Sequence, residues 1–262
     1  MLRKYFNLFI FIIILISTSY LFLNIGKIFD PFSINLNARY QKPSLNHPFG
    51  TDYLGRDLFA RTMYAIGISL KISIIALFIS FILSFIFGSI SGFFHNKFPD
   101  KIISWIYDIL ITVPLILILS AALSVLKPSI EITYLIVGLL IWPIPARLIK
   151  GEIIQIKNST FILADKALGI PKYLTILKSF PLIFYPALSN LLFNLPELIT
   201  LEIGISFLGF GVQPPNPSLG KLIFQGILDA NIAWWEALFP VLVLIILMIL
   251  IFIFTQKLKF KY

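Results

Sequence analysis

Long apolar stretches, separated by short polar ones, run through most of the chain. A helix rises 1.5 Å per residue, so roughly 20 apolar residues cross the hydrocarbon core of a bilayer. Six stretches approach this length, although proline or acidic residues interrupt some of them. They are Phe6 to Leu23, Ile72 to Phe93, Ile103 to Leu126, Ile130 to Ala146, Ile183 to Leu208 and Trp234 to Thr255. The pattern predicts an all-α membrane protein with about six transmembrane helices.

The first apolar stretch has two interpretations, a cleaved secretory signal or a retained span. It follows Arg3 and Lys4, as the apolar part of a signal peptide follows a basic start. The run is longer than the roughly 7–15 residues of a signal, and Tyr20 to Phe22 is not a small-x-small cleavage site. We therefore expect residues 1–24 to form a retained N-terminal transmembrane helix.

The composition excludes several classes of protein. The 262 residues are 58% hydrophobic and 13% charged, with a mean hydropathy of +0.95, against about 45–50% and about 25% in soluble domains. The net charge of +9 does not require nucleic acid, because Lys and Arg concentrate in the cytoplasmic loops of membrane proteins. The chain has no cysteine, so it has no disulfide, thiolate nucleophile or cysteine metal site. Membrane lipid is the expected surrounding, and no nucleic acid partner is expected.

The basic residues outside the spans predict the orientation. Most of them fall on the same side as the N-terminus, so the positive-inside rule places both termini in the cytoplasm. Residues 25–67 then form an extracytoplasmic loop. Residues 68–256 form a core of five transmembrane helices that includes a cytoplasmic loop at 147–182, and residues 257–262 form a short cytoplasmic tail.

The cytoplasmic loop has a helical pattern of its own. Ser159 or Thr160 can cap a first helix that runs through Leu168, and Gly169 is a typical stop. Pro171 suits the first turn of a second helix. Apolar residues recur at helical spacing in both segments, so each helix has one apolar face that a partner or a membrane surface must cover. The pattern predicts a cytoplasmic helix-turn-helix.

Residues suited to catalysis are sparse. His47 and His95 lie in different loops on opposite predicted sides, so they cannot share a metal. The chain contains neither Gly-x-x-x-x-Gly-Lys-Ser/Thr nor Gly-x-Gly-x-x-Gly, so we do not expect it to bind ATP. The small-xxx-small spacing of Gly88 and Gly92 predicts close helix packing. We expect no catalytic residue, no cofactor and no metal.

Three acidic residues, Asp108, Glu197 and Glu202, fall at membrane depth, where a charge needs a cavity, a partner or an interface. Asp108 lies near the cytoplasmic end of its stretch and could snorkel or pair with Lys101. Glu197 and Glu202 could line a polar pathway or a subunit interface. An intramembrane enzyme built on these acids is an alternative, but no nucleophile or metal set accompanies them.

Three stretches together identify a family resemblance. His47 to Asp57, Ala164 to Gly169 and Glu202 to Gly220 resemble, in order and spacing, the second permease subunit of bacterial ABC importers for dipeptides, oligopeptides or nickel. The motif positions are His47, Gly50, Thr51, Asp52, Gly55, Arg56 and Asp57 in the first stretch, and Ser206, Gly209, Gly211, Gln213, Pro214 and Pro215 in the third.

The resemblance implies a fold, a function and a set of partners. The chain would be half of a translocation pathway in a bacterial inner membrane, completed by a homologous second permease subunit. One or two cytoplasmic ATPase subunits would drive it, and an extracytoplasmic substrate-binding protein would deliver a peptide or nickel. The chain itself would not be an enzyme. A self-sufficient channel or secondary transporter is the alternative.

The resemblance also implies how the ATPase is contacted. In the family, a Glu-Ala-Ala-x-x-x-Gly loop forms a coupling helix that sits in a groove on the ATPase. In this chain Leu163 replaces the Glu and Asp165 replaces the second Ala. The residues implied to couple are Phe161, Ala164, Asp165, Ala167, Leu168 and Gly169.

Overall fold

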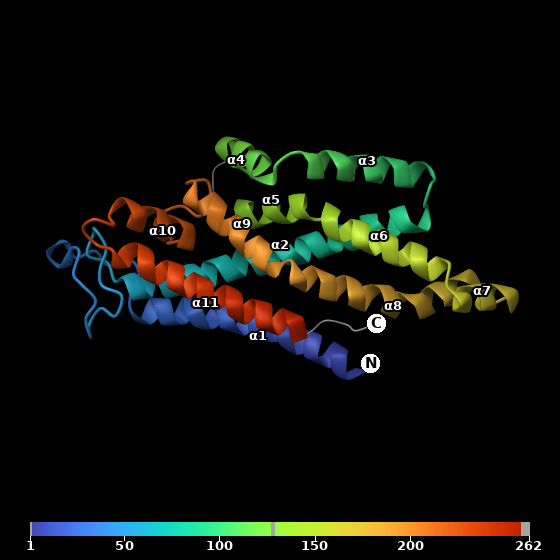
Figure 1. The fold of residues 1–262 in the computed structure, drawn as a ribbon, viewed down its shortest axis with the longest axis horizontal. Coiled ribbons are helices and arrows are strands. Elements are labelled where there is room, and N and C mark those ends of the chain that lie inside the picture. Colours follow the sequence, from blue (N-terminus) through green and yellow to red (C-terminus); the bar gives the residue numbers. More distant parts are fainter. Residues whose placement is uncertain (1, 127–128, 258–262) are drawn as a thin grey trace.

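The computed structural model describes residues 2–126 and 129–257 as one long bundle of helices (Figure 1). The tail predicted at 257–262 lies outside the described residues, except for Lys257. Within the described ranges no strand forms, and the one β-bridge joins Thr51 to Asp57. This confirms the all-α prediction.

Eleven α-helices and one short 3₁₀ helix form in the described part of the chain. They are α1 (Leu2–Ile28), η1 (Leu36–Ala38), α2 (Leu58–Phe93), α3 (Phe98–Thr112), α4 (Leu115–Val125), α5 (Ile130–Ile141), α6 (Pro143–Lys157), α7 (Thr160–Ala167), α8 (Lys172–Phe193), α9 (Leu195–Phe207), α10 (Leu219–Leu228) and α11 (Trp235–Lys257).

Among the described residues, five helical stretches are long and apolar enough to cross a membrane. They are Ile10–Ile28, Leu58–Phe93, Ile130–Lys157, Lys178–Phe207 and Trp235–Gln256. Two of them join consecutive helices, α5 with α6 and α8 with α9. The multi-pass membrane architecture is therefore confirmed.

The third predicted span, Ile103 to Leu126, differs from the structure. It is two shorter helices, α3 and α4, which lie in sequence along one side of the bundle (Figure 1). The break falls at Val113 and Pro114, where Val113 has the extended conformation φ −82°, ψ 129°. Proline disfavours a helical conformation in the residue before it and has no N–H to donate. Pro114 therefore ends α3 in the middle of an apolar run.

Several helices extend into segments that the sequence predicts as loops. α1 continues to Ile28 and α2 begins at Leu58 rather than near Ile72, so only residues 29–57 separate them. Asp57 caps α2, because its Oδ1 accepts the N–H of Ala60 at 2.7 Å. α6 likewise continues to Lys157, and α8 continues through Pro181 and Pro186.

α2 is the central element, and it packs against α1, α5, α6 and α9 (Figure 1). A methyl group on Gly88 would lie 2.6 Å from the carbonyl oxygen of Ala146, and one on Gly92 would lie 2.8 Å from Cβ of Ile153. Both contacts join α2 to α6. The helix-packing prediction for these glycines is confirmed.

The two ends of the bundle carry different features. Residues 29–57 and α10 lie at one end, and α7 with the turn into α8 lies at the other (Figure 1). α1 begins and α11 ends toward the end that carries α7. Each end therefore presents its own candidate site.

Candidate functional site

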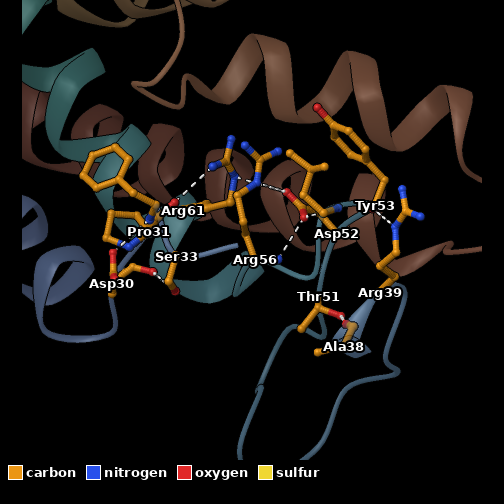
Figure 2. Close-up of polar contacts among 12 residues, drawn as sticks. Asp30, Pro31, Ser33, Ala38, Arg39, Thr51, Asp52, Tyr53, Arg56 and Arg61 are labelled. Atoms are coloured by element: carbon orange, nitrogen blue, oxygen red, sulfur yellow. Dashed lines mark hydrogen bonds and ion pairs between the residues drawn. The ribbon is translucent and has the colours of Figure 1, made fainter. Parts of the chain in front are cut away.

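Residues 47–57, here called the motif loop, fold around the side chain of Asp52. Its Oδ1 accepts the N–H groups of Leu54 at 2.9 Å and Arg56 at 3.0 Å, and its Oδ2 accepts Nε of Arg56 at 2.8 Å. Nε of Arg61, from the first turns of α2, lies 3.5 Å from the same Oδ2. Figure 2 shows Arg56 and Arg61 side by side, facing this carboxylate. Asp52 therefore holds both the loop backbone and two guanidinium groups.

Other motif positions fix the loop to its surroundings. The hydroxyl of Thr51 donates to the carbonyl of Ala38 at 2.5 Å and accepts the N–H of Gln41 at 2.8 Å. Nδ1 of His47 lies 2.7 Å from Oδ2 of Asp57, the residue that caps α2. These bonds give the motif residues a structural role, which is to hold the loop against α2.

Two glycines of the motif loop occupy positions that a side chain would block. Gly50 and Gly55 have φ of +74° and +71°, in the left-handed region. A methyl group on Gly55 would lie 1.8 Å from the carbonyl oxygen of Asn35. Gly55 therefore cannot be replaced for two reasons: its backbone is left-handed, and a side chain would clash with Asn35.

The third motif stretch, Glu202 to Gly220, closes the end of α9. Gly209 has φ +85°, and its N–H donates to the carbonyl of Ser206 at 3.1 Å. The N–H of Phe210 donates to the carbonyl of Ile205 at 3.1 Å, which completes a Schellman motif. Nε2 of Gln213 donates back to the carbonyl of Gly209 at 2.9 Å. The motif therefore reverses the chain sharply after α9.

The structure places Glu197 and Glu202 in different environments, although the sequence suggests the same role for both. Glu202 is completely buried inside the chain, and its Oε1 accepts the hydroxyl of Ser206 at 2.8 Å. Glu197 is exposed on α9. Of the two, only Glu197 lies where a second subunit can reach it, and its role at an interface or pathway stays a prediction.

The first and third motif stretches, which are far apart in sequence, meet in one pocket, here called the motif pocket. Its lining includes Asp52, Arg56 and Arg61 on one side and Pro214, Lys221 and Glu236 on the other. The first three come from the motif loop and α2, and the others from the turn after α9, from α10 and from the start of α11. Sequence reasoning singled out both motifs but missed that they share a pocket.

Trp235 fastens the motif loop to α11. Its ring is buried, and its Nε1 donates to the carbonyl of Thr51 at 3.2 Å. Its neighbour Trp234 is 54% exposed. No sequence signal distinguishes the two tryptophans or pairs one of them with a loop so far away along the chain.

At the opposite end, α7 stops where the sequence predicts. Gly169 has φ +70°, and its N–H donates to the carbonyl of Lys166 at 3.2 Å. The N–H of Ile170 donates to the carbonyl of Asp165 at 2.9 Å, so the same Schellman arrangement recurs. The cap at the other end differs from the prediction, because the hydroxyl of Ser159 donates backwards to Ile156 at 2.6 Å and no side chain caps α7.

The predicted coupling residues divide between two faces of α7. Asp165 is buried toward α8, where Nζ of Lys178 lies 3.2 Å from each of its oxygens and Thr175 donates at 3.4 Å. Leu163 and Leu168 are 56% and 77% exposed. Of the other predicted residues, Phe161 is half-buried, and Ala164, Ala167 and Gly169 are exposed. The exposed part of α7 and its stop therefore consists of small and apolar residues, together with one charged residue, Lys166.

Two ion-pair groups fix α3 to α6. Asp108 pairs with Arg147, not with Lys101 as the sequence suggested, because α6 continues past Arg147 and carries it alongside α3. Asp100 is buried and accepts bonds from Lys150 and Ser91. Burial opposes ionisation of Asp100, but these hydrogen bonds outweigh it and hold its pKa well below the usual range.

The five long apolar helical stretches of the described residues, with the motif pocket at one end of the bundle and α7 at the other, define a multi-pass helical membrane protein. Residues 84–259 match the family described as the binding-protein-dependent transport system inner membrane component. This match covers more than half of the chain, and the chain belongs to that family. Its members are transport subunits of the inner membrane, and ATP hydrolysis in these systems belongs to separate subunits.

Curated relatives agree with this assignment. The dipeptide transport system permease protein DppC of Alkalihalophilus pseudofirmus is 31% identical over 79% of this chain and 68% of the relative. The oligopeptide transport system permease protein OppC of Mycobacterium bovis is 31% identical over 80% of this chain and 73% of the relative. The glutathione transport system permease protein GsiD of Shigella dysenteriae is 34% identical over 77% of this chain and 67% of the relative.

Proposed function

We propose that this chain is one of two permease subunits of an ATP-driven peptide importer. Dipeptides, oligopeptides and glutathione appear in the names of its relatives, and all three are peptides. The proposal therefore takes a peptide, rather than nickel, as the cargo. The partners are a homologous second permease, one or two cytoplasmic ATPase subunits and an extracytoplasmic substrate-binding protein.

The observation that carries the proposal is the exposed apolar face of α7. Leu163 and Leu168 are more than half exposed at the extreme end of the bundle. Burying apolar area gains about 25 cal/mol per Å², and a short helix with one apolar face is the usual ligand of a groove. Gly169 closes this helix without adding bulk. The face fits a groove on an ATPase subunit.

The helices around α7 suit it to transmit movement. α6 leads into α7 and packs on the central helix α2 through Gly88 and Gly92. α8 leaves α7 and continues into the bundle as far as Phe193, where α9 follows at once. A displacement of α7 would therefore move two long helices together. ATP can drive a change in the permease only if the ATP-bound ATPase subunits bind one of its two conformations more tightly than the other.

The orientation belongs to the same proposal. Basic residues are most frequent on the side of the N-terminus, and the positive-inside rule makes that side cytoplasmic. α1 begins and α11 ends toward the end that carries α7, so that end faces the cytosol and the ATPase. The motif pocket then faces the binding protein on the other side.

The test uses the assembled transporter in proteoliposomes. Changing both Leu163→Asp and Leu168→Asp places charges in the apolar contact, so we expect peptide uptake to fall at least tenfold, since about 1.4 kcal/mol of lost contact corresponds to a tenfold change. The matched control is Leu45→Asp, at a fully exposed residue of the 29–57 segment, and it should leave uptake unchanged. Undiminished uptake in the double variant, or peptide transport by this chain without ATPase subunits, would contradict the proposal.

A further inference from the structure

The motif pocket contains charged groups that the chain pairs only in part. Among the described residues, no hydrogen bond or ion pair engages the ammonium group of Lys221. Oε1 of Glu236 and Nε of Arg61 are both buried without a hydrogen-bond partner there. The guanidinium of Arg61 does lie at ion-pair distance from Asp52, and its Nη1 donates to the carbonyl of Pro31 at 3.0 Å. Unpaired buried polar atoms cost free energy. An anionic ligand that pairs with Lys221 and Arg61 would recover part of that cost.

The pocket has an excess of positive charge. Arg56, Arg61 and Lys221 line it together with two acids, Asp52 and Glu236, so even with both acids ionised one positive charge is left over. Asp52 already accepts bonds from two backbone N–H groups and from Arg56. Burial lowers the pKa of Lys221, and the nearby charges of Arg61 and Arg56 lower it further. A single anionic group would make the pocket neutral.

The size of the pocket limits what can enter it. Its volume is about 50 Å³, and one water needs about 10–15 Å³ measured in this way. A carboxylate group fits this volume, whereas a whole peptide does not. Three prolines, Pro214, Pro215 and Pro217, form part of the lining, and proline restricts the backbone. The pocket is thus a small, rigid receptor for the tip of a side chain.

We propose that the motif pocket receives one Asp or Glu side chain presented by the extracytoplasmic binding protein. The carboxylate would pair with Lys221 and with the guanidinium groups of Arg56 and Arg61, as charged groups at protein interfaces do. This inference rests on the proposed function, because it needs a binding protein and a pocket that faces outward.

The first experiment measures docking. The complete transporter is reconstituted in proteoliposomes of zwitterionic lipid, and ATPase activity is recorded against the concentration of peptide-loaded binding protein. Lys221→Met should raise the half-saturating concentration about tenfold, and Lys221→Arg should restore most of the affinity. Lys42→Met removes the same charge from an exposed residue outside the pocket and should leave the half-saturating concentration unchanged.

A charge reversal identifies the partner carboxylate. Lys221→Glu should raise the half-saturating concentration further than Lys221→Met does. A binding protein in which one surface Asp or Glu is changed to Lys should then recover docking to Lys221→Glu and lose docking to the wild type. If Lys221→Met behaves as Lys42→Met does, the proposal is wrong. If the Lys221 effect occurs only in vesicles that contain phosphatidylglycerol, the pocket binds a lipid headgroup instead, and the proposal is again wrong.

A separate measurement distinguishes failure of this inference from failure of the proposed function. The chain has no native cysteine, so single-cysteine variants can be labelled cleanly. In intact cells a membrane-impermeant maleimide should label Asn231→Cys, in the turn before α11, and should not label Asn158→Cys, next to α7. The reverse labelling would overturn the proposed orientation. The expected labelling with no Lys221 effect would overturn only the docking inference.

Discussion

At the scale of single residues, Asp165 shows how this chain departs from the family pattern without losing the shape of α7, the proposed coupling helix. The family pattern has alanine at this position, on a helix expected to contact another subunit. In this chain the carboxylate turns toward α8 and pairs with Lys178 and Thr175. The charge of Asp165 therefore lies inside the α7–α8 hairpin, and it adds no acidic group to the exposed surface around Leu163 and Leu168.

The Asp165 pair predicts a measurable local effect. Asp165→Ala removes an ion pair whose lysine is about half exposed, so solvent screening limits the loss to about 1 kcal/mol or less. Amide hydrogen exchange in α7 should become faster by a few-fold. Lys178→Met should have a similar but smaller effect, because Thr175 still donates to Asp165 in that variant. The double variant should add nothing to Asp165→Ala, because both changes remove the same ion pair. Additive effects would show that the two residues act independently. Lys166→Met, on the exposed side of α7, is the control.

At the scale of elements, glycine sets how closely helices approach. α2 and α6 touch at Gly88 and Gly92, where any side chain would meet backbone atoms or Cβ of α6. Gly204 in α9 is different, because a methyl group there would meet nothing within 4 Å. Glycines in apolar helices thus have different roles: Gly88 and Gly92 allow close packing, whereas Gly204 does not. Only the neighbouring residues distinguish the two cases.

This contrast predicts opposite signs for one substitution. Gly88→Ala pushes α2 and α6 apart, and overpacking of this kind costs about 1–3 kcal/mol. Gly204→Ala gains about 0.5–1 kcal/mol, since alanine restricts the unfolded chain and favours the helix. The measurement is the thermal unfolding midpoint of the purified protein in detergent, which should fall for the first variant and rise for the second. Equal shifts would contradict the close-packing interpretation.

At the scale of the whole molecule, one buried tryptophan connects the two parts that build the motif pocket. Trp235 belongs to the first turn of α11, and its Nε1 bonds the carbonyl of Thr51 in the motif loop. The pocket therefore depends on a contact between a segment near the start of the chain and the last helix. Loss of that contact should loosen the loop without unfolding the bundle.

A conservative pair of variants tests this connection. Trp235→Phe keeps an apolar ring but leaves the Thr51 carbonyl without its donor, at a cost of about 1–3 kcal/mol for a buried group. Limited proteolysis should cleave the 29–57 segment faster in this variant. Trp234→Phe changes an exposed ring and should leave the cleavage rate as it is. Equal rates for both variants would mean that Trp235 does not hold the loop.

Four features could be predicted from the sequence alone: the class of the protein, the helical bundle, the stop at Gly169 and the close packing at Gly88 and Gly92. These features depend on local properties, namely apolar run length, the left-handed conformation of glycine and the absence of a side chain. The resemblance carried by the motif stretches supplied the family, which the comparisons confirmed.

The burial of Glu202, the partner of Asp108 and the inward turn of Asp165 were settled by tertiary packing, whereas the break at Pro114 follows from a local signal, the proline itself. Tertiary packing also brought the first and third motif stretches into one pocket and chose Trp235 over Trp234 as the contact to Thr51. Each of these packing outcomes depends on which distant segment packs against a residue, and spacing along one chain carries no information about that. A periodic pattern shows which face of a helix is apolar, whereas burial and charge pairing follow from the neighbour that covers it.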